Sequence, residues 1–284
     1  MQVVETVRVL RTQVLAWKRQ GLSVGFVPTM GNLHAGHLSL IQVARQNCDR
    51  VVASIFVNPL QFGPNEDFDR YPRTFESDVQ KLTLEYTDLL FSPSVSEMYP
   101  KGQAQSVVQV PDTLTGILEG TSRPGHFDGV TTVVNKLFNM VQPDVAVFGQ
   151  KDFQQFAVIA RMVDDLAMPV ELIRAPIERD QDGLALSSRN QYLTHQQREI
   201  APKLQTTLLD IALALQSGNR DFIALAKAAC ENLMRHGFDS VDYIEVVNPQ
   251  TLLGSEVTDT AFAILAVAKL GDTRLLDNIL LEAI

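Results

Sequence analysis

The sequence predicts an α/β protein built on a doubly wound, mostly parallel sheet, with a smaller C-terminal α+β domain. Up to about residue 176, short apolar runs alternate with longer segments whose apolar residues recur at helical spacing. This alternation is typical of a parallel sheet with helices on both faces. Beyond residue 178 the order changes to two helical patterns followed by two strand-like runs. We therefore expect two domains, over residues 1–176 and 177–284.

The first domain alternates between strands and helices along the chain. The apolar runs have the length of buried strands, and we expect strands at residues 23–28, 50–57, 88–91, 107–110, 144–148 and 170–175. The segments between them carry apolar residues at helical spacing, and we expect helices at residues 37–48, 75–86, 112–118, 127–141 and 153–167. In a sheet of this kind, ligands bind beyond the carboxyl ends of the strands.

The second domain begins after a polar, glycine-containing loop at residues 180–190. Two apolar helical faces follow, one formed by Leu204, Leu208, Ile211 and Leu215, the other by Ile223, Ala226, Cys230 and Leu233. Strand-like runs at residues 241–247 and 261–268 complete the pattern. Helices and strands are segregated here, as expected for an α+β domain.

Composition excludes several classes of function. The chain has 284 residues, of which 45% are hydrophobic, enough for a large core. It carries 24 Lys and Arg against 33 Asp and Glu, and a net charge of −9 disfavours a nucleic-acid partner. The first residues lack a secretion signal, and no apolar run approaches membrane-spanning length, so we expect a cytoplasmic protein without a membrane partner. Cys48 and Cys230 lie on apolar helical stripes and are expected to be buried thiols.

The segment from Pro28 to His37 carries the strongest functional signal. It ends the apolar run 24–27 and opens a helical pattern, which predicts a strand, a tight turn and a helix N-terminus. Unpaired N–H groups and the positive end of the helix dipole favour an anion there. Gly31 allows close approach of the backbone to a phosphate, and the imidazoles of His34 and His37, three residues apart, can donate hydrogen bonds to it. We therefore expect a nucleotide at this turn.

Two other interpretations of the histidine pair stay open, a zinc half-site and a purely structural pair. Zinc needs three or four ligands, whereas the chain has five His and two Cys, with neither Cys-x-x-Cys nor His-Glu-x-x-His. The chain also contains neither the Gly-x-Gly-x-x-Gly dinucleotide motif nor a P-loop. Neither of these two motifs therefore explains a phosphate site at the turn.

Polar residues follow two further strands. Asn58 to Gln61 come after the second predicted strand, and Gly149 to Asp152 come after a later one. Because carboxyl ends of parallel strands meet at one edge of the sheet, we expect these segments and the histidine turn to converge on one crevice. The long loop 61–74 is expected to act as a lid or binding loop.

These motifs together resemble the pantothenate synthetase (pantoate–β-alanine ligase) family, a branch of the nucleotidylyltransferase superfamily with its HIGH-type motif. The matching strings cover residues 27–37, 56–62, 71–74, 123–127, 148–155 and 182–190. The order and spacing of the strings agree with that family over nearly the whole chain. One departure is Gln150, where the family usually has Glu, and it concerns the local support of Lys151.

The resemblance implies a Rossmann-like doubly wound sheet and a defined reaction. In that reaction pantoate is condensed with β-alanine at the expense of ATP, through pantoyl adenylate, giving pantothenate, AMP and pyrophosphate. It also implies magnesium, held mainly by ATP oxygens, and a two-domain homodimer. One alternative is another member of the superfamily, either a plain nucleotidylyltransferase or a tRNA-charging enzyme. A second is a non-catalytic nucleotide-binding module.

The resemblance also implies site residues. The ATP-binding residues would be Met30, Gly31, Asn32, Leu33, His34, Ala35, Gly36, His37, Gly149, Gln150, Lys151, Asp152, Leu186, Ser187, Ser188 and Arg189. The catalytic residues among these would be His34, His37, Lys151 and Arg189, with His37 as proton donor. Gln61 and Gln155 would bind pantoate, and Gln61 would also border β-alanine.

Each of these side chains has an ordinary alternative role. Lys151 and Arg189 could be solvated surface charges, Asp152 could cap the following helix, and Gln61 and Gln155 could be ordinary loop and helix glutamines. Four further residues match the family strings and are expected to shape the pocket without an assigned role, namely Tyr71, Arg73, Asp78 and His126.

Overall fold

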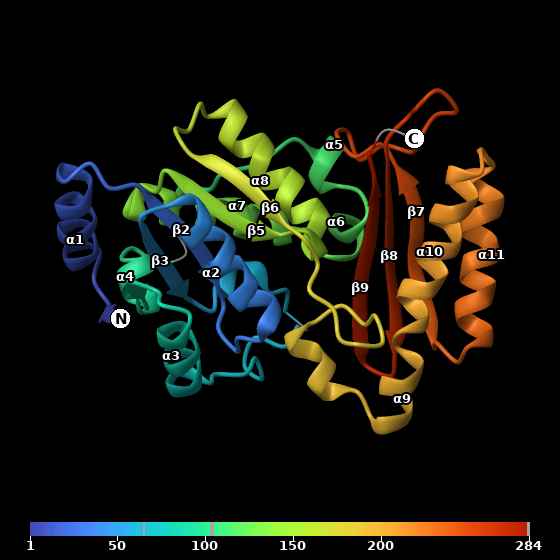
Figure 1. The fold of residues 1–284 in the computed structure, drawn as a ribbon, viewed down its shortest axis with the longest axis horizontal. Coiled ribbons are helices and arrows are strands. Elements are labelled where there is room, and N and C mark those ends of the chain that lie inside the picture. Colours follow the sequence, from blue (N-terminus) through green and yellow to red (C-terminus); the bar gives the residue numbers. More distant parts are fainter. Residues whose placement is uncertain (65, 103–104, 283–284) are drawn as a thin grey trace. The chain divides into compact units, whose positions relative to one another are not determined.

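The computed structural model describes residues 1–64, 66–102 and 105–282. The chain divides into two compact units, the first formed by Met1–Gly149 with Gln155–Ala175, the second by Gln150–Gln154 with Pro176–Ile284. The short segment 150–154 therefore belongs to the second unit, although it directly follows a strand of the first. Figure 1 shows the elements of each unit.

The first unit contains a parallel sheet, as predicted. Its strands in the described residues are β1 (Gln2–Val4), β2 (Val24–Thr29), β3 (Arg50–Ile55), β4 (Leu89–Phe91), β5 (Val145–Gly149) and β6 (Glu171–Ala175). All pair in parallel, in the order β1-β4-β3-β2-β5-β6. The chain moves from β2 to β3 and β4 on one side and later to β5 and β6 on the other. The order therefore reverses beside β2, which is where such sheets bind ligands.

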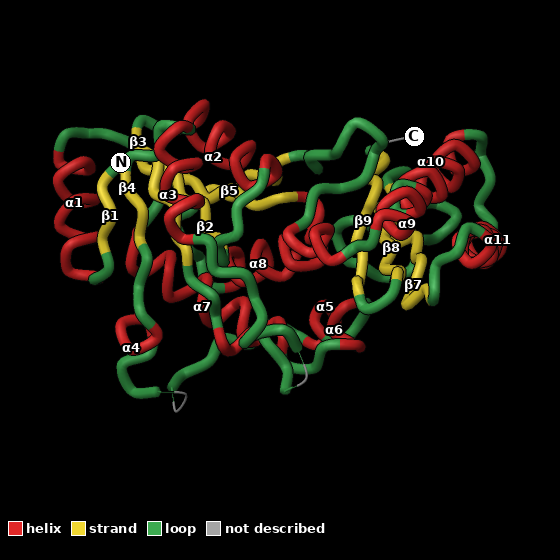
Figure 2. Tube along the Cα trace, turned by 90° about the horizontal axis from the view of Figure 1, so that it is seen from below, coloured by secondary structure: helices red, strands yellow, loops and turns green. Residues whose placement is uncertain are grey.

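Helices cover both faces of this sheet. The helices of this unit in the described residues are α1 (Val7–Arg19), α2 (Ala35–Asn47), α3 (Phe75–Leu84), α4 (Val95–Met98), α5 (Asp112–Thr115), α6 (Glu119–Ser122), α7 (His126–Val141) and α8 (Phe153–Asp165). Ile41 of α2 and Leu82 of α3 pack in one buried cluster with Val27 of β2. On the other face, Phe138 of α7 contacts Phe26 of β2, with ring centroids 6.4 Å apart. Figure 2 shows α7 and α8 on the face opposite α2.

Two elements predicted for the first unit are wrong. Residues 107–110 form no strand, because the N–H of Val108 donates to Thr132 Oγ1 (3.0 Å) and its carbonyl accepts from Thr131 Oγ1 (2.5 Å). The segment thus bonds to side chains of α7 instead of a neighbouring strand. The helix expected over 112–118 ends at Thr115 as α5, and Leu118, which has a positive φ of 51°, precedes the separate helix α6.

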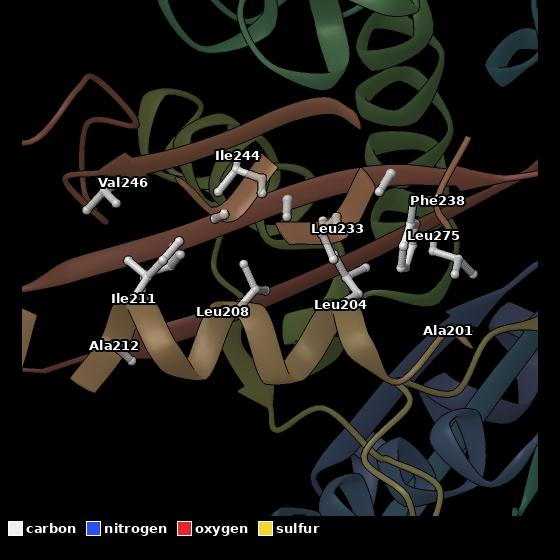
Figure 3. Packing of buried hydrophobic residues seen from close by; sticks show 14 of the residues in the cluster. Ala201, Leu204, Leu208, Ile211, Ala212, Leu233, Phe238, Ile244, Val246 and Leu275 are labelled. Atoms are coloured by element: carbon white, nitrogen blue, oxygen red, sulfur yellow. The ribbon is translucent and has the colours of Figure 1, made fainter. Parts of the chain in front are cut away.

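The second unit is an α+β domain, as predicted. Its elements are η2 (Gln150–Asp152), η3 (Ser188–Tyr192), α9 (His195–Ile200), α10 (Lys203–Gln216), α11 (Phe222–Arg235), β7 (Ser240–Val247), β8 (Phe262–Leu270) and β9 (Thr273–Leu281). The strands are antiparallel in the order β7-β8-β9. Leu204, Leu208 and Ile211 of α10, Leu233 of α11 and Ile244 of β7 belong to one buried apolar cluster, and Figure 3 labels them. This apolar layer is the core of the unit.

The thiols are more exposed than predicted. Cys48 directly follows α2, and Cys230 lies on α11; both are half-buried and free. Each packs at the border of an apolar cluster, and burial raises the pKa of both thiols. In the described part of the chain, no helix is both long and apolar enough to span a bilayer.

Candidate active site

The turn after β2 is held by one buried carboxylate, that of Asp78. Its Oδ2 accepts from the N–H of Asn32 and its Oδ1 from the N–H of Leu33, both at 2.8 Å. Asp78 is only 1% exposed, and Thr74 Oγ1 donates to it as well, at 3.1 Å. Hydrogen bonds to an ionised acceptor are the stronger kind, so Asp78 on α3 fixes the backbone of this turn.

Glycine at position 31 is required for two reasons. Its φ is +85°, a backbone conformation that side chains rarely allow. A Cβ there would also lie 3.1 Å from Ile55 Cγ2 and 3.2 Å from Asp78 Oδ2. The predicted tight turn is therefore confirmed, and the carboxylate of Asp78 contributes to the need for glycine.

The two histidines cap the helix that they begin. His34 Nδ1 accepts from the N–H of Gly36 at 3.2 Å, and His37 Nδ1 accepts from the N–H of His34 at 3.3 Å. The two ring planes are tilted by 43° to each other, with centroids 4.1 Å apart. Because each Nδ1 accepts, the neutral rings carry their proton on Nε2. The pair therefore has a structural role, and its Nε2–H groups are the donors suited to a phosphate.

This capping corrects one part of the anion-site prediction. The N–H groups of Gly36 and His37 are not unpaired, because the first donates to the His34 ring and the second to the His34 carbonyl at 2.8 Å. A phosphate at this helix end would be recognised mainly by imidazole donors. The described residues include no group of three or more His, Cys, Asp and Glu side chains that could hold a metal ion.

Gln61 ends a 3₁₀ turn, η1 (Pro59–Gln61), that is held by the buried Asn58. Asn58 Nδ2 donates to Gln61 Oε1 at 2.9 Å and to the carbonyl of Gly129 at 3.1 Å. Tyr99 OH donates to Asn58 Oδ1 at 2.7 Å. The Gln61 side chain is thus oriented by a buried neighbour that is itself hydrogen-bonded. Sequence reasoning did not single out Asn58 or Tyr99 in this way.

The loop 61–74 packs on its own aromatic side chains; its residue 65 lies outside the described residues. The ring of Phe62 lies 5.3 Å from that of Phe68 and 5.9 Å from that of Tyr71, and Tyr71 is buried. The Arg73 guanidinium lies over the Phe68 ring at 5.8 Å. Tyr71 and Arg73 therefore shape the loop. Its action as a lid remains a prediction.

A cavity of about 290 Å³ lies at the carboxyl ends of β2, β3 and β4. Its walls are Met30, Gly31, Ile55, Phe56, Val57, Phe68, Pro72, Arg73, Thr74, Phe75, Asp78, Pro93, Ser94 and Val95. Met30 and Gly31 are predicted ATP-binding residues, whereas Gln61 and the histidines do not line this cavity. It thus adjoins the histidine turn from the side of the 61–74 loop.

Gln150 and Lys151 are held within the second unit by Asn278 of β9. The Asn278 side chain donates to the carbonyls of Gln150 and Lys151, both at 2.9 Å, and Gln150 Nε2 donates to Asn278 Oδ1 at 3.1 Å. Lys151 pairs with Asp152 at 3.2 Å, and its side chain is 20% exposed. Lys151 is therefore not a solvated surface charge, and Gln150 contributes to its support.

Asp277, next to Asn278, forms a buried ion pair. Arg179 donates to both of its oxygens, at 2.7 and 2.8 Å. Asp277 is 4% exposed, and burial raises the pKa of its carboxyl although Arg179 opposes this effect. The pair anchors the segment that leads into the loop 180–190.

The loop 180–190 is ordered by its own polar contacts. Ser187 Oγ accepts from the N–H of Arg189 at 3.3 Å and so caps η3. Arg198 pairs with Asp180 and Asp182, and these contacts hold the pKa of both carboxyls below the ordinary range. Ser187 and Arg189 thus lie at the start of a fixed turn.

The predicted site residues fall into two groups. The first unit holds the segment 30–37 after β2, Gln61 after β3, Gly149 at the end of β5 and Gln155 on α8. The second unit holds Gln150–Asp152 and the residues 186–189. Asp78 and Asn278 lie 45 and 127 residues from backbone groups that they bind, whereas Asn58 lies only three residues from Gln61. The structure, and not the sequence, gives these three buried side chains their supporting role.

His126 begins α7 and contacts Gln61. Its Nδ1 lies 2.9 Å from the Gln61 carbonyl, and its Nε2 lies 3.0 Å from Arg123 Nη1. Burial, and then the neighbouring Arg123 charge, lower the pKa of His126 from 6.5 to about 4. The ring is therefore neutral at neutral pH.

This pKa predicts acid sensitivity. The unfolded chain binds a proton at His126 below pH 6.5, whereas the folded chain binds it only near pH 4. The free energy of unfolding therefore decreases as the pH is lowered from 6.5 to about 4. The loss is up to about 3 kcal/mol. Urea unfolding of the protein and of His126→Asn, from neutral pH down to about pH 4, measures it. A difference between the two that is independent of pH would contradict the prediction.

A doubly wound parallel sheet with a histidine-capped turn at its switch point defines a nucleotide-binding enzyme of the α/β class. The model of the family described as pantoate-beta-alanine ligase matches residues 2–280. Pantothenate synthetases of Hydrogenovibrio crunogenus and Pseudomonas putida are 60% and 54% identical to the chain. The alignments cover 99% of this chain in both cases, and 100% and 98% of those relatives.

Two solved structures are similar throughout. Pantothenate synthetase from Thermus thermophilus gives a TM-score of 0.92 at 46% identity, covering 98% of this chain and 99% of that one. Pantoate-β-alanine ligase from Francisella tularensis, complexed with beta-gamma ATP and β-alanine, gives 0.83 at 34% identity, covering 99% and 97%. The chain therefore belongs to the pantoate–β-alanine ligase family, and it is an enzyme of the ligase class.

Proposed function

We propose that this enzyme condenses pantoate with β-alanine at the expense of ATP, through pantoyl adenylate, and releases pantothenate, AMP and pyrophosphate. The observation that carries the proposal is the family match over residues 2–280. The Francisella tularensis relative, complexed with beta-gamma ATP and β-alanine, supports two of the three substrates.

The chemistry requires two steps. A carboxylate is a poor acyl donor, because oxide is a poor leaving group. The pantoate carboxylate therefore attacks the α-phosphorus of ATP, a P–O bond forms, and pyrophosphate leaves. The β-alanine amine, as –NH₂, then attacks the acyl carbon of the adenylate, AMP leaves, and the nitrogen loses one proton as the amide forms. The first step concentrates negative charge around the phosphates, so fixed donors and cations there lower its barrier.

The residues of the turn supply donors for this step. We assign the Nε2–H groups of His34 and His37 to the phosphates, with His37 as the proton donor, because each Nδ1 is used by the helix cap. We assign positive charge to Lys151 and Arg189, and hydroxyl and backbone donors to Ser187 and Ser188. The held backbone of Lys151 supports this assignment.

The two glutamines serve pantoate. We assign Gln61 and Gln155 to its hydroxyls and carboxylate, with Gln61 also bordering β-alanine. The bonding of Gln61 Oε1 to Asn58 supports this assignment, because it turns the Gln61 amide NH₂ into the group available to orient a substrate oxygen. The other predicted residues at 30–36, 149–152 and 186–188 would surround ATP.

Magnesium would enter with ATP. It would be bound mainly by phosphate oxygens and water, with few protein ligands. When bound, magnesium neutralises phosphate charge.

We also propose that the enzyme is a cytoplasmic homodimer without nucleic-acid or membrane partners. Light scattering after size-exclusion chromatography tests the dimer.

Isotope exchange tests the order of the steps. With ATP, magnesium and pantoate but no β-alanine, we expect labelled pyrophosphate to exchange into ATP and about one adenylate to form per site. Addition of β-alanine then releases pantothenate and AMP. Exchange that requires β-alanine would contradict a separate adenylation step. Release of ADP and phosphate would contradict attack at the α-phosphate.

A further inference from the structure

We propose that Arg123, Glu66 and His126 form a clamp that positions the main chain of Gln61, and that this clamp sets the affinity for pantoate. The inference rests on the proposed function, in which Gln61 binds pantoate. None of the three clamp residues is assigned a role in the reaction above, and each acts on substrate only through Gln61. They are therefore positioning residues.

Arg123 is the centre of the clamp. Its Nε and Nη2 donate to the two oxygens of Glu66, at 2.7 and 2.6 Å. The same Nη2 donates to the carbonyl of Gln61 at 3.2 Å, and Nη1 contacts His126 Nε2 at 3.0 Å. A planar guanidinium can serve all three partners at once, whereas the single nitrogen of lysine cannot. Glu66 thus fixes the plane of Arg123, and Arg123 fixes its other two partners.

The tautomer of His126 follows from its partners. The Gln61 carbonyl can only accept, so Nδ1, at 2.9 Å, carries the proton and donates. Nε2 must then accept from Arg123, which only a neutral ring can do. This is the opposite tautomer from that of His34 and His37. The Gln61 carbonyl thus receives two donors, one from Arg123 and one from His126.

The side chain of Gln61 is held from a second direction. Asn58 donates to Gln61 Oε1, and Asn58 is itself bonded to Tyr99 and to the carbonyl of Gly129. A Cβ at Gly129 would collide with the carbonyl of Leu60, so η1 lies directly against α7. Main chain and side chain of Gln61 are both fixed before substrate arrives. A group held in its binding geometry loses less entropy on binding, which raises affinity.

The clamp is suited to positioning more than to stability. The side chains of Arg123 and Glu66 are 19% and 27% exposed, and ion pairs near solvent contribute little to folding. The clamp joins Gln61 and Glu66 to Arg123 and His126 near the start of α7. Its loss should therefore loosen Gln61 while the sheet and helices persist.

Substrate affinity in four variants tests the clamp. Arg123→Lys and Glu66→Gln weaken the paired hydrogen bonds between Arg123 and Glu66. His126→Ala removes one donor to the Gln61 carbonyl, and His126→Asn can restore a donor near the Nδ1 position. Arg161→Lys is the matched control, because Arg161 forms an exposed ion pair with Asp165 on α8. We expect KM for pantoate to rise about tenfold in Arg123→Lys and His126→Ala, the effect of one lost hydrogen bond to a charged or fixed partner.

Further readouts separate positioning from general loosening. We expect smaller effects in Glu66→Gln and His126→Asn, and an unchanged KM for ATP, kcat and melting temperature in all variants. An unchanged KM for pantoate in Arg123→Lys and His126→Ala would overturn the clamp alone. Equal rises in both KM values with a lower melting temperature would overturn it as well. Wild-type enzyme inactive toward pantoate would overturn both this inference and the proposed function.

Discussion

Replacing Lys151 by alanine is expected to slow adenylate formation about 10²- to 10³-fold, the effect of removing one fixed donor from a developing charge. Asn278 binds the backbone carbonyl of Lys151, and this hydrogen bond does not depend on the lysine side chain. The mutation therefore removes the charge while the backbone stays in place. Folding should persist, because the side chain is partly exposed and its ion pair is with the neighbouring Asp152. Single-turnover pyrophosphate release measures the rate.

The control for this prediction is another lysine ion pair. Lys18 pairs with Asp144 at 2.8 Å with a side chain that is 31% exposed, and Lys18→Ala should keep the normal rate. Arg189→Ala should resemble Lys151→Ala, because both cations are assigned to the same phosphates. Near-normal adenylation in Lys151→Ala would remove this residue from the site. A large loss of stability with normal chemistry would give it a structural role.

Replacing Asp78 by alanine is expected to lower the free energy of unfolding by about 3–5 kcal/mol, because two backbone N–H donors lose their hydrogen-bond acceptor. The N–H groups of Asn32 and Leu33 would lose the acceptor that binds both of them, and Leu33 is buried. The turn that carries His34 would then shift, so ATP affinity should fall as well. Urea unfolding and ATP binding measure the two effects.

The isosteric variant separates charge from shape. Asp78→Asn keeps one oxygen and should lose less stability than Asp78→Ala, since one N–H of the turn can still be bonded. Glu76, exposed on the same helix, provides the control, and Glu76→Ala should change neither stability nor ATP affinity. Normal stability of Asp78→Ala would show that the turn does not depend on this carboxylate.

Local sequence predicted most of the parallel sheet because its strands are buried on both faces. Such strands are continuous apolar runs, which a reader can recognise without knowing their partners. The run at 107–110 has the same composition, yet its backbone bonds to threonines of α7, and composition cannot reveal that. Strand β9 shows the converse case, a true strand that lacks a continuous apolar run and was not predicted. Its Asp277 and Asn278 interrupt the apolar pattern, and their partners lie at Arg179 and Gln150.

By itself, the sequence determined which segment carries the histidines, where glycine must permit a tight turn, and which family the motifs resemble. These properties depend on residue type and short spacing. Only the tertiary structure decided what holds the site. Asp78 binds the turn from 45 residues away, Arg123 reaches Gln61 from 62 away, and Asn278 reaches Lys151 from 127 away. A buried polar group must find a partner, but local sequence does not say which one, because the partner is brought by the packing of the whole chain.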